Sequence, residues 1–434
     1  MSFQNLGLSP AILRALSELG HTTPTPIQRD AIPLIIDGND LMGAAQTGTG
    51  KTGGFALPIL ERLFPGGKRD TASTRAPRVL VLTPTRELAA QVHDSIRDYG
   101  KYLGVRSTTI FGGVGMQPQV EALRRGIDVL VATPGRLIDH LERRTVDLSA
   151  VDTLVLDEAD RMLDMGFMPA LKRILLVLPR QNRQTLMFSA TFPDEIKKLA
   201  AQFLHQPREV QASPRNTVAN AITHLVHPVD AARKKDLLVD LLAADSRRQT
   251  LVFARTKHGA DKLVKSLCIT GFKAAAIHGN KSQGARTRAL ADFKSGRTVI
   301  LVATDIAARG LDIPQLPVVV NYDLPMVAED YVHRIGRTGR AGEEGLAISL
   351  VAQEEAHLLR DIQRLLKQEI RIENHSGFVP SRALSIADAV RPPKPGKARP
   401  AHNVRRGHTS AGNGKPGGHS KPQSPHHGQG RARA

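Results

Sequence analysis

The sequence predicts an α/β fold, with two parallel-sheet domains in tandem followed by a disordered basic tail. Three observations carry this prediction: short apolar runs that alternate with segments of helical period, a pause in that alternation near residue 210, and a C-terminal stretch without acidic residues. The chain has 434 residues, and at about 150 residues per domain this length allows two or three domains.

Apolar runs of four to seven residues recur along both halves of the chain, each ending in a small, polar or charged residue. Continuous runs rich in Val, Ile and Leu are typical of strands that are buried on both faces of a parallel sheet. The predicted strands are 79–83, 128–133, 153–157 and 185–189 in the first half, and 250–254, 274–278, 298–304, 318–321 and 346–351 in the second.

Helical periodicity lies between these runs. Residues 86–99 place Leu88, Val92 and Ile96 at i, i+4 and i+8, which predicts an amphipathic helix. A last helix is expected near 354–370, with one apolar face made of Leu358, Ile362, Leu365 and Leu366. Strands that alternate with helices in this way indicate parallel sheets with right-handed crossover connections.

The alternation pauses at about 207–221, where turn-forming residues replace the periodic pattern. We therefore predict a first domain at 1–208, a linker at 209–220, a second domain at 221–370 and a basic, Gly- and Pro-rich, disordered tail at 371–434. Ligands of such sheets bind beyond the carboxyl ends of the strands, so functional residues are expected there.

The chain is strongly basic, with 60 Lys and Arg residues against 41 Asp and Glu, a formal net charge of +19. Such a balance points to a polyanionic partner, either nucleic acid or an acidic membrane surface. Residues 391–434 hold ten of the basic residues and no acidic one. This Gly- and Pro-rich segment is predicted to be disordered, and to act either as a flexible RNA anchor or as a solubilising end.

One cysteine, Cys268, excludes a disulfide framework and a multi-cysteine zinc site. We interpret it as a small core side chain. No apolar run reaches the roughly 18–20 residues that cross a bilayer, and the first residues lack the pattern of a secretory signal. A soluble, cytoplasmic protein is therefore expected. The tail histidines, including His426 and His427, lack the ordered spacing of a metal site.

Residues 45–52 read AQTGTGKT, close to the P-loop pattern G-x-x-x-x-G-K-[ST]. Ala45 stands at the first glycine position, while Gly50, Lys51 and Thr52 match. A glycine-rich loop lets backbone N–H groups surround phosphate oxygens. Lys51 is expected to reach the β- and γ-phosphates and Thr52 to ligate Mg²⁺. An ordinary Gly/Thr turn is the alternative, and Gly53 and Gly54 are unusual so early in a helix.

The run 151–160 reads VDTLVLDEAD and delivers two carboxylates at the end of a predicted strand. Asp157 is placed to hold the Mg²⁺ shell, and Glu158 to orient and deprotonate an attacking water. The alternative is an acidic surface turn, which a buried strand and an upstream P-loop make less favourable.

The run 331–340 reads YVHRIGRTGR and repeats arginine every three residues, at Arg334, Arg337 and Arg340. Arginines that reach a γ-phosphate accelerate its transfer by about 10³- to 10⁵-fold. The alternative is a solvated basic turn or a patch that binds only RNA phosphates.

These three motifs, in this order, resemble those of the DEAD-box family of superfamily 2 RNA helicases. The DEAD sequence itself stands at 157–160, and the resemblance covers roughly residues 1–370. Within the family the chain looks most like the bacterial RhlE group. The further matching motifs are GHTTPTPIQ at 20–28, PTRELA at 84–89, GG at 112–113, TPGR at 133–136, SAT at 189–191, LVFART at 251–256, Gln283 with Arg286, and ATDIAARGLDIP at 303–314.

The resemblance implies two RecA-like domains that close on ATP and single-stranded RNA, with ATP and Mg²⁺ at one site. It makes Gln28 the adenine-selective residue, Phe3 a ring that stacks on adenine or a hydrophobic staple, and Asp312 a ribose contact. The implied nucleotide-binding residues are Phe3, Gln28, Ala45, Gln46, Thr47, Gly48, Thr49, Gly50, Lys51, Thr52 and Asp312. The implied catalytic residues are Lys51, Asp157, Glu158, Arg337 and Arg340, with Thr52 and Asp157 at the metal.

The resemblance also places RNA across both domains. The implied contacts address phosphate and sugar, so little sequence selectivity is expected. They are Thr85, Arg86, Gly113, Thr133 and Arg136 in the first domain, and Arg255, Arg286 and Thr304 in the second. Residues implied to couple ATP to RNA are Asp160, Ser189, Thr191 and His333.

The expected function is RNA-stimulated ATP hydrolysis that drives local unwinding or remodelling of RNA, in processes such as ribosome assembly or RNA turnover. Two alternatives remain open from the sequence. The chain could be an ATP-gated RNA clamp or scaffold with slow turnover, or a DNA helicase of the same superfamily. Comparing ATPase stimulation by RNA with that by matched DNA separates the last of these, because the 2′-OH distinguishes the two polymers.

Overall fold

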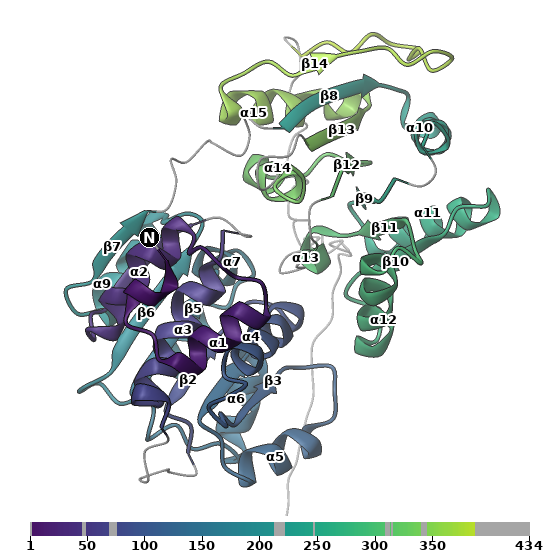
Figure 1. Ribbon diagram of the computed structural model, residues 1–434. Helices are drawn as coiled ribbons and strands as arrows, with labels where there is room; N and C mark the ends of the chain where they lie inside the picture. Colours follow the sequence, from purple (N-terminus) through teal and green to yellow (C-terminus); the bar gives the residue numbers. More distant parts are fainter. Residues whose placement is uncertain are drawn as a thin grey trace, which may run out of the picture. The chain divides into compact units, whose positions relative to one another are not determined.

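Two parallel sheets form the framework of the computed structural model, and each sheet has its own set of covering helices (Figure 1). The structure describes residues 2–45, 49–68, 76–211, 222–245, 248–308, 313, 316–339 and 345–386. The predicted disorder of residues 391–434 therefore lies outside the described residues, as does most of the predicted linker.

The first sheet has seven parallel strands among the described residues, in the order β3-β4-β2-β5-β6-β1-β7. Because all of these strands are parallel, their carboxyl ends lie at one edge of the sheet. The strands are β1 (Leu41–Ala44), β2 (Val79–Leu82), β3 (Ser107–Ile110), β4 (Val129–Ala132), β5 (Thr153–Asp157), β6 (Gln184–Ser189) and β7 (Arg208–Gln211).

Two separate cores pack against the two faces of this sheet. Alternate residues of β2 illustrate the division, since Val79 and Val81 belong to one cluster and Leu80 and Leu82 to the other. The first face is covered by α1 (Pro10–Glu18), α2 (Pro26–Ile36), α3 (Lys51–Leu63) and α4 (Arg86–Tyr99). The second is covered by α5 (Met116–Arg124), α6 (Pro134–Glu142), α7 (Ala159–Asp164), α8 (Met168–Val177) and α9 (Asp194–Phe203).

The second sheet also has seven parallel strands among the described residues, in the order β10-β11-β9-β12-β13-β8-β14. Its strands are β8 (Ile222–Pro228), β9 (Thr250–Phe253), β10 (Ala274–Ile277), β11 (Ile300–Ala303), β12 (Val318–Asn321), β13 (Gly345–Val351) and β14 (Arg371–Ile372). Its helices are α10 (Lys234–Ala243), α11 (Lys257–Ile269), α12 (Gln283–Lys294), α13 (Asp305–Ala308), α14 (Ala328–Ile335) and α15 (Ala356–Leu366).

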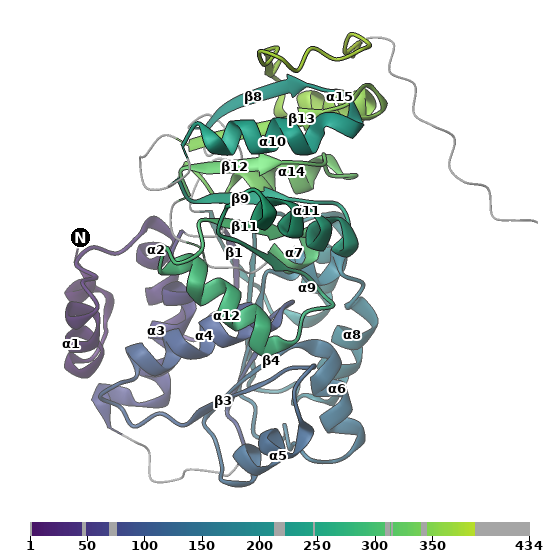
Figure 2. The same ribbon diagram turned by 90° about the vertical axis from the view of Figure 1, so that its right-hand side faces the viewer.

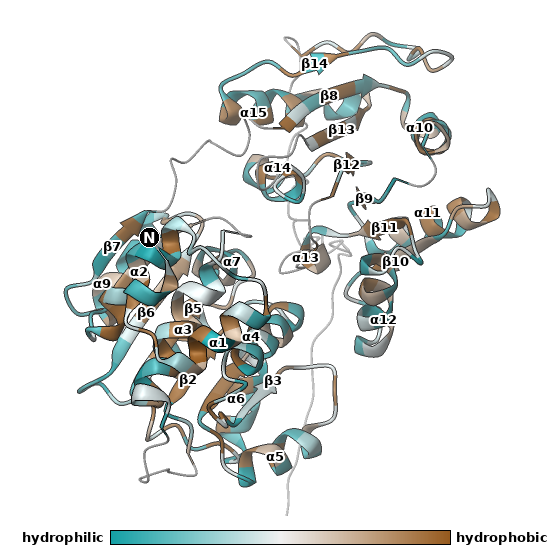
Figure 3. Cartoon of the chain, viewed as in Figure 1, coloured by the Kyte–Doolittle hydropathy of each residue, from teal (hydrophilic) through white to brown (hydrophobic). Residues whose placement is uncertain are grey.

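In the second domain α10 and α11 pack on one face of the sheet, as Figure 2 shows, while α12 and α13 pack on the other beside α14 and α15. Hydrophobic residues follow the strands and the inner faces of the helices, and hydrophilic residues lie on their outer turns (Figure 3). None of the described helices is long and apolar enough to cross a membrane.

The predicted α/β class, with two parallel-sheet domains, is confirmed, and all nine predicted strands are present. The helix predicted at 86–99 matches α4, which begins after Thr85 because the Thr85 hydroxyl accepts a hydrogen bond from Leu88 N at 3.2 Å. Strand β7 extends to Gln211 and β14 lies at 371–372. In each domain, regular structure therefore extends a few residues beyond the C-terminal boundary that the sequence predicted.

Two local predictions were wrong. Cys268 is exposed rather than in the core, because it follows the buried Leu267 and therefore lies about 100° around α11 from the apolar face. Leu365 is 37% exposed, while Leu358 and Ile362 are buried. The apolar face of α15 is therefore narrower than the sequence spacing indicated.

Candidate functional site

The P-loop lies between β1 and α3 at the carboxyl edge of the first sheet. The backbone N–H of Ala45 donates to the carbonyl of Ser189 at 3.0 Å, so the loop leaves the sheet beside the end of β6. Gly50 precedes α3 with φ +88°, a conformation that favours glycine. Lys51 and Thr52 are then the first two residues of the helix. Gln46, Thr47 and Gly48 lie outside the described residues.

Gln28 connects the GHTTPTPIQ segment at 20–28 to this loop. Its Oε1 accepts from the backbone N–H of Thr25 at 2.9 Å, and its Nε2 donates to the carbonyl of Gly50 at 3.0 Å. The first bond also caps α2, so the residue predicted to select adenine is positioned by a helix N-terminus. Phe3, the predicted stacking ring, is buried in the first-domain core.

The two glycines at the start of α3, Gly53 and Gly54, differ in the space that a side chain would have. A Cβ at Gly53 would lie 2.6 Å from Gln28 Nε2, whereas a Cβ at Gly54 would meet nothing closer than 3.9 Å. Gly53 therefore leaves room for the Gln28 amide, which explains its early position in the helix.

We expect Gly53→Ala to weaken ATP binding about tenfold, because the added methyl displaces the Gln28 amide from hydrogen bonds of roughly 1 kcal/mol each. Gly54→Ala is the matched control, and we expect it to raise the free energy of unfolding by up to about 1 kcal/mol with unchanged affinity. Nucleotide titration and chemical denaturation of both variants measure these effects. Equal affinities for the two variants would contradict the role of Gly53.

The two predicted catalytic carboxylates lie at the end of β5, both buried. Glu158 has φ 54° and ψ 52°, a left-handed conformation that costs a non-glycine residue about 1–3 kcal/mol and is typical of functional sites. Among the described residues Lys51 Nζ, Asp157 Oδ1 and Glu158 Oε2 are buried polar atoms without a hydrogen-bond partner. Burial raises the pKa of Asp157 to about 7, although the nearby Lys51 opposes this shift.

The predicted coupling residues of the first domain are joined by hydrogen bonds. Asp160 Oδ2 accepts from the backbone N–H of Thr191 at 2.9 Å and from its hydroxyl at 3.0 Å. The Ser189 hydroxyl accepts from the backbone N–H of Asp160 at 3.2 Å and donates to the carbonyl of Thr191 at 2.6 Å. Burial works against ionisation of Asp160, but Lys51 and Arg161 outweigh it and lower its pKa. Asp160 is therefore ionised and holds the SAT segment.

Arg161 is a site residue that the sequence analysis missed. Its side chain is almost fully buried, its Nε lies 3.5 Å from Glu158 Oε2, and its Nη2 lies 3.3 Å from Nδ1 of His333. It also lines a pocket with Asp305, His333 and Arg337. The position directly after the DEAD sequence carried no periodic or charge signal that could have identified it.

The three arginines of 331–340 have different surroundings. Arg334 is buried and bonds to Asp305 through Nε at 2.6 Å and Nη2 at 2.8 Å. Its Nη1 donates to Asn321 Oδ1 at 3.0 Å and to the carbonyl of Asp323 at 2.6 Å. Arg334 therefore stabilises the fold through these partners, and both Arg334 and Arg337 line the pocket. Arg340 and the predicted ribose contact Asp312 lie outside the described residues.

Three of the predicted RNA contacts of the first domain meet at the start of α4. Thr85 caps the helix, and Arg86 is its first residue. A Cβ at Gly113, where φ is +79°, would lie 1.9 Å from Arg86 Nη1, so only glycine lets this guanidinium lie over the loop. The arrangement exposes a backbone turn and a cation next to each other.

The same loop contacts the TPGR segment from its other side. Thr133 precedes α6, and Arg136 donates from both Nη atoms to the carbonyl of Val114 at 3.1 Å. Gln119 of α5 donates to the carbonyl of Phe111 at 3.0 Å. The loop at 111–114 is therefore held by side chains from three helices, and it brings all five predicted first-domain contacts into one region.

The RNA contact predicted at Arg286 lies near the start of α12, together with Gln283 of the same motif. In this structure Arg286 Nη2 lies 2.8 Å from Glu87 Oε2, and Gln283 Nε2 donates to Glu87 Oε1 at 3.1 Å. Glu87 was not predicted, although it lies inside the PTRELA motif directly after Arg86. Its carboxylate pairs with the guanidinium that is predicted to contact RNA.

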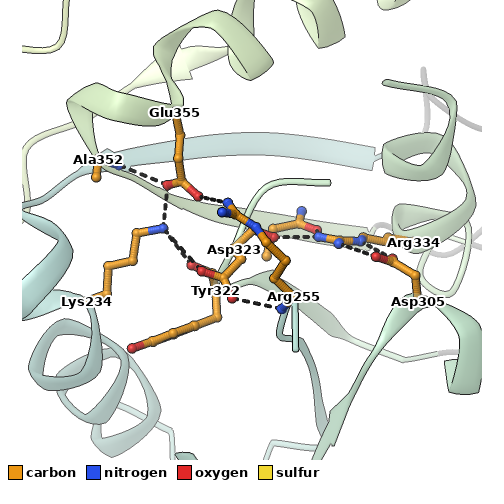
Figure 4. A network of polar contacts seen from close by, with 9 residues as sticks. Lys234, Arg255, Asp305, Tyr322, Asp323, Arg334, Ala352 and Glu355 are labelled. Carbon is orange, nitrogen blue, oxygen red and sulfur yellow. Dashed lines mark hydrogen bonds and ion pairs between the residues drawn. The ribbon is translucent and has the colours of Figure 1, made fainter. Parts of the chain in front are cut away.

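Thr304 and Arg255 complete the predicted set. The carbonyl of Thr304 accepts from the backbone N–H groups of Ala307 and Ala308, and this residue directly precedes α13. Arg255 follows β9, and its Nη2 lies 2.8 Å from Glu355 Oε1 (Figure 4). Both residues lie at the carboxyl edge of the second sheet.

The comparisons with known proteins agree with this geometry. A family model described as DEAD/DEAH box helicase matches residues 25–199, and one described as helicase conserved C-terminal domain matches residues 233–342. The chain is similar to yeast Dbp5 bound to RNA and ADP BeF3, with a TM-score of 0.75 and 32% identity, covering 87% of this chain and 95% of that one.

Curated relatives extend the agreement. The chain is 45% identical over 393 residues to the ATP-dependent RNA helicase DeaD of Mycobacterium tuberculosis, covering 90% of this chain and 68% of that protein. It is 45% identical over 368 residues to the DEAD-box ATP-dependent RNA helicase 30 of Arabidopsis thaliana, covering 84% of this chain and 62% of the relative. The chain thus spans less than two thirds of the length of the Arabidopsis relative. The grouping with RhlE stays a prediction. On its motifs, its two matched domains and these relatives, the chain belongs to the DEAD-box family of ATP-dependent RNA helicases.

Proposed function

We propose that this chain is an RNA-dependent ATPase that separates or remodels short RNA duplexes. The observation that carries the proposal is the set of buried polar atoms without a hydrogen-bond partner at Lys51, Asp157 and Glu158, of which the Glu158 oxygen has only a long ion pair, 3.5 Å from Arg161 Nε. Buried polar groups are normally hydrogen-bonded. An ammonium group and two carboxylates left open at the carboxyl edge of one sheet suit a nucleotide phosphate, a metal ion and a water molecule.

The residues present fit Mg²⁺, which takes oxygen ligands and binds proteins through one or two carboxylates together with substrate phosphates. Asp157, whose Oδ1 has no partner, and the Thr52 hydroxyl would hold the ion. Bound there, Mg²⁺ would neutralise charge on the phosphates. The described residues include no cluster of three or more His, Cys, Asp or Glu side chains suited to a metal.

The chain's own groups account for the remaining chemistry. Lys51 would neutralise the β- and γ-phosphates, and Gln28, already aligned by Thr25 and Gly50, would pair with the adenine edge. Glu158 would take a proton from water as the water oxygen bonds to the γ-phosphorus and the bond to ADP breaks. Arg337 and Arg340 would stabilise the charge that develops on the transferred phosphoryl group. Phe3, Ala45 to Thr49 and Asp312 would complete the nucleotide site.

RNA would lie along the region that Thr85, Arg86, Gly113, Thr133 and Arg136 form in the first domain, and along Arg255, Arg286 and Thr304 in the second. Hydroxyl, guanidinium and backbone groups bind phosphate and sugar, which supports low sequence specificity. Asp160, Ser189, Thr191 and His333 would couple this binding to ATP. The ten basic residues of 391–434 would add a salt-dependent attraction to RNA.

Steady-state ATP hydrolysis with and without single-stranded RNA tests the proposal, with matched single-stranded DNA as the comparison. We expect RNA to stimulate turnover strongly and DNA weakly, and short RNA duplexes to be separated. Absence of RNA stimulation would overturn the proposal. Stimulation with RNA lifetimes on the protein longer than an ATP turnover, and without duplex separation, would instead support an RNA clamp.

We further propose, on family analogy alone, that the protein works in the cytoplasm on ribosome assembly or RNA turnover. The division into 1–208, 209–220, 221–370 and 371–434 likewise remains a proposal, supported by one sheet on either side of residues 212–221.

A further inference from the structure

A buried network of charged side chains connects the segments that follow three neighbouring strands of the second sheet, β9, β12 and β13 (Figure 4). Its centre is the carboxylate of Glu355, whose side chain is 9% exposed. Glu355 Oε1 lies 2.8 Å from Arg255 Nη2, and its Oε2 lies 2.5 Å from Lys234 Nζ and accepts from the backbone N–H of Ala352 at 3.2 Å. Both carboxylate oxygens are therefore committed to fixed partners.

Arg255 is held at both of its ends by this network. Its backbone N–H donates to Asp323 Oδ2 at 2.8 Å, and its guanidinium is paired with Glu355. The side chain nevertheless stays 43% exposed, so part of the guanidinium faces solvent. A long cation that is exposed and yet fixed is ready to meet a phosphate without first losing rotamer freedom.

Lys234 holds in place the Glu355 carboxylate that pairs with Arg255. Its Nζ is buried, donates to the carbonyl of Tyr322 at 2.8 Å, and lies 3.9 Å from Asp323 Oδ1. It therefore joins Glu355 to the segment that carries Asp323, and both acceptors of Arg255 belong to one rigid unit. A surface ion pair that only solubilised the protein would not need a buried lysine behind it.

We propose that Glu355 is a positioning residue, which orients the Arg255 guanidinium for contact with an RNA phosphate. The inference rests on the proposed function, because it takes Arg255 to touch RNA. Glu355 itself does not touch RNA, since its two oxygens are occupied and its side chain is buried. Its effect on RNA binding therefore passes entirely through Arg255.

A double-mutant cycle tests this statement with the full-length chain. The variants are Glu355→Gln, Arg255→Ala and their combination, and the readout is the RNA concentration that gives half-maximal ATPase activity. We expect Glu355→Gln to raise that concentration roughly two- to tenfold at unchanged maximal turnover, as expected when one long side chain must be ordered on binding. In the Arg255→Ala background the same change is expected to have no further effect.

Thermal melting of the four proteins separates this effect from stability, because Glu355→Gln also removes the counter-ion of Lys234 in both backgrounds. Glu142→Gln is the matched control, since Glu142 forms an exposed ion pair with Arg173 at 2.8 Å. Three results would each overturn the proposal. The first is that Glu355→Gln raises the RNA concentration for half-maximal activity equally with and without Arg255, and the second is that Glu355→Gln binds RNA more tightly. The third is that RNA stimulates the wild type but Arg255→Ala leaves the RNA requirement unchanged. A wild type that RNA does not stimulate would instead refute the proposed function itself.

Discussion

Glu158→Gln is expected to lower RNA-stimulated ATP turnover by about 10²- to 10⁴-fold, the usual contribution of a positioned general base. The amide keeps the size of the side chain but cannot take a proton from water. Nucleotide binding is expected to persist, because the P-loop and the Gln28 amide are separate from this carboxylate. The loss should therefore appear in kcat, with little change in the affinity for ATP.

Single-turnover hydrolysis and direct nucleotide titration measure the two quantities separately. Glu195→Gln, an exposed acidic residue in the first turn of α9, is the matched control and is expected to behave like the wild type. A variant that retains more than about a tenth of the wild-type turnover would show that Glu158 is not the base. Loss of nucleotide binding as well would mean that this carboxylate supports the site rather than the chemistry.

Arg334→Gln and Arg337→Gln are expected to fail in different ways, although the two residues lie three positions apart. Removing Arg334 leaves Asp305 and the fully buried Asn321 without their shared partner. Arg334 is buried while Asp305 is 27% exposed, and breaking a buried pair costs up to about 3–5 kcal/mol of folding free energy. At about 2–4 °C per kcal/mol for a domain of this size, the melting temperature should fall by about 10 °C.

Arg337→Gln is expected to lower ATP turnover by about 10³- to 10⁵-fold, as for other arginines that stabilise the transferred phosphoryl group. Its melting temperature is expected to fall much less than that of Arg334→Gln. Differential scanning calorimetry and ATPase assays at saturating RNA measure both properties. Equal losses of melting temperature in the two variants would contradict the separate roles.

The fold was predictable from the sequence wherever strands are buried on both faces. β2, β4 and β9 are continuous apolar runs, and each appears where the pattern placed it. Five strands were missed, namely β1, β3, β7, β8 and β14. Two of them lie at the edges of the first sheet, where β3 reads STTI and β7 reads REVQ, with one buried residue each. Edge strands of this kind are specified by pairing with a neighbour rather than by their own composition.

The candidate site was predictable to the level of motifs, since Lys51, Asp157 and Glu158 do lie at one edge of one sheet. The sequence could not distinguish the role of Arg334 from that of Arg337, because both belong to the same three-residue repeat. Arg334 differs in its hydrogen bonds to Asp305 and Asn321, which lie far away in the sequence. Arg161, Glu87 and Glu355 were missed for the same reason. Each is defined by partners that lie far away in the sequence or are distributed over several strands.

The exposed position of Cys268 has a practical use. It is the only cysteine of the chain, and it lies on the second domain near the end of α11. A maleimide fluorophore can therefore be attached at one defined point of the unaltered protein. Adding Leu176→Cys on α8, where the native side chain is 59% exposed, supplies a second dye on the first domain. Energy transfer between the two dyes would then report any change in the distance between the two domains when ATP or RNA is added, without the prior removal of a native thiol.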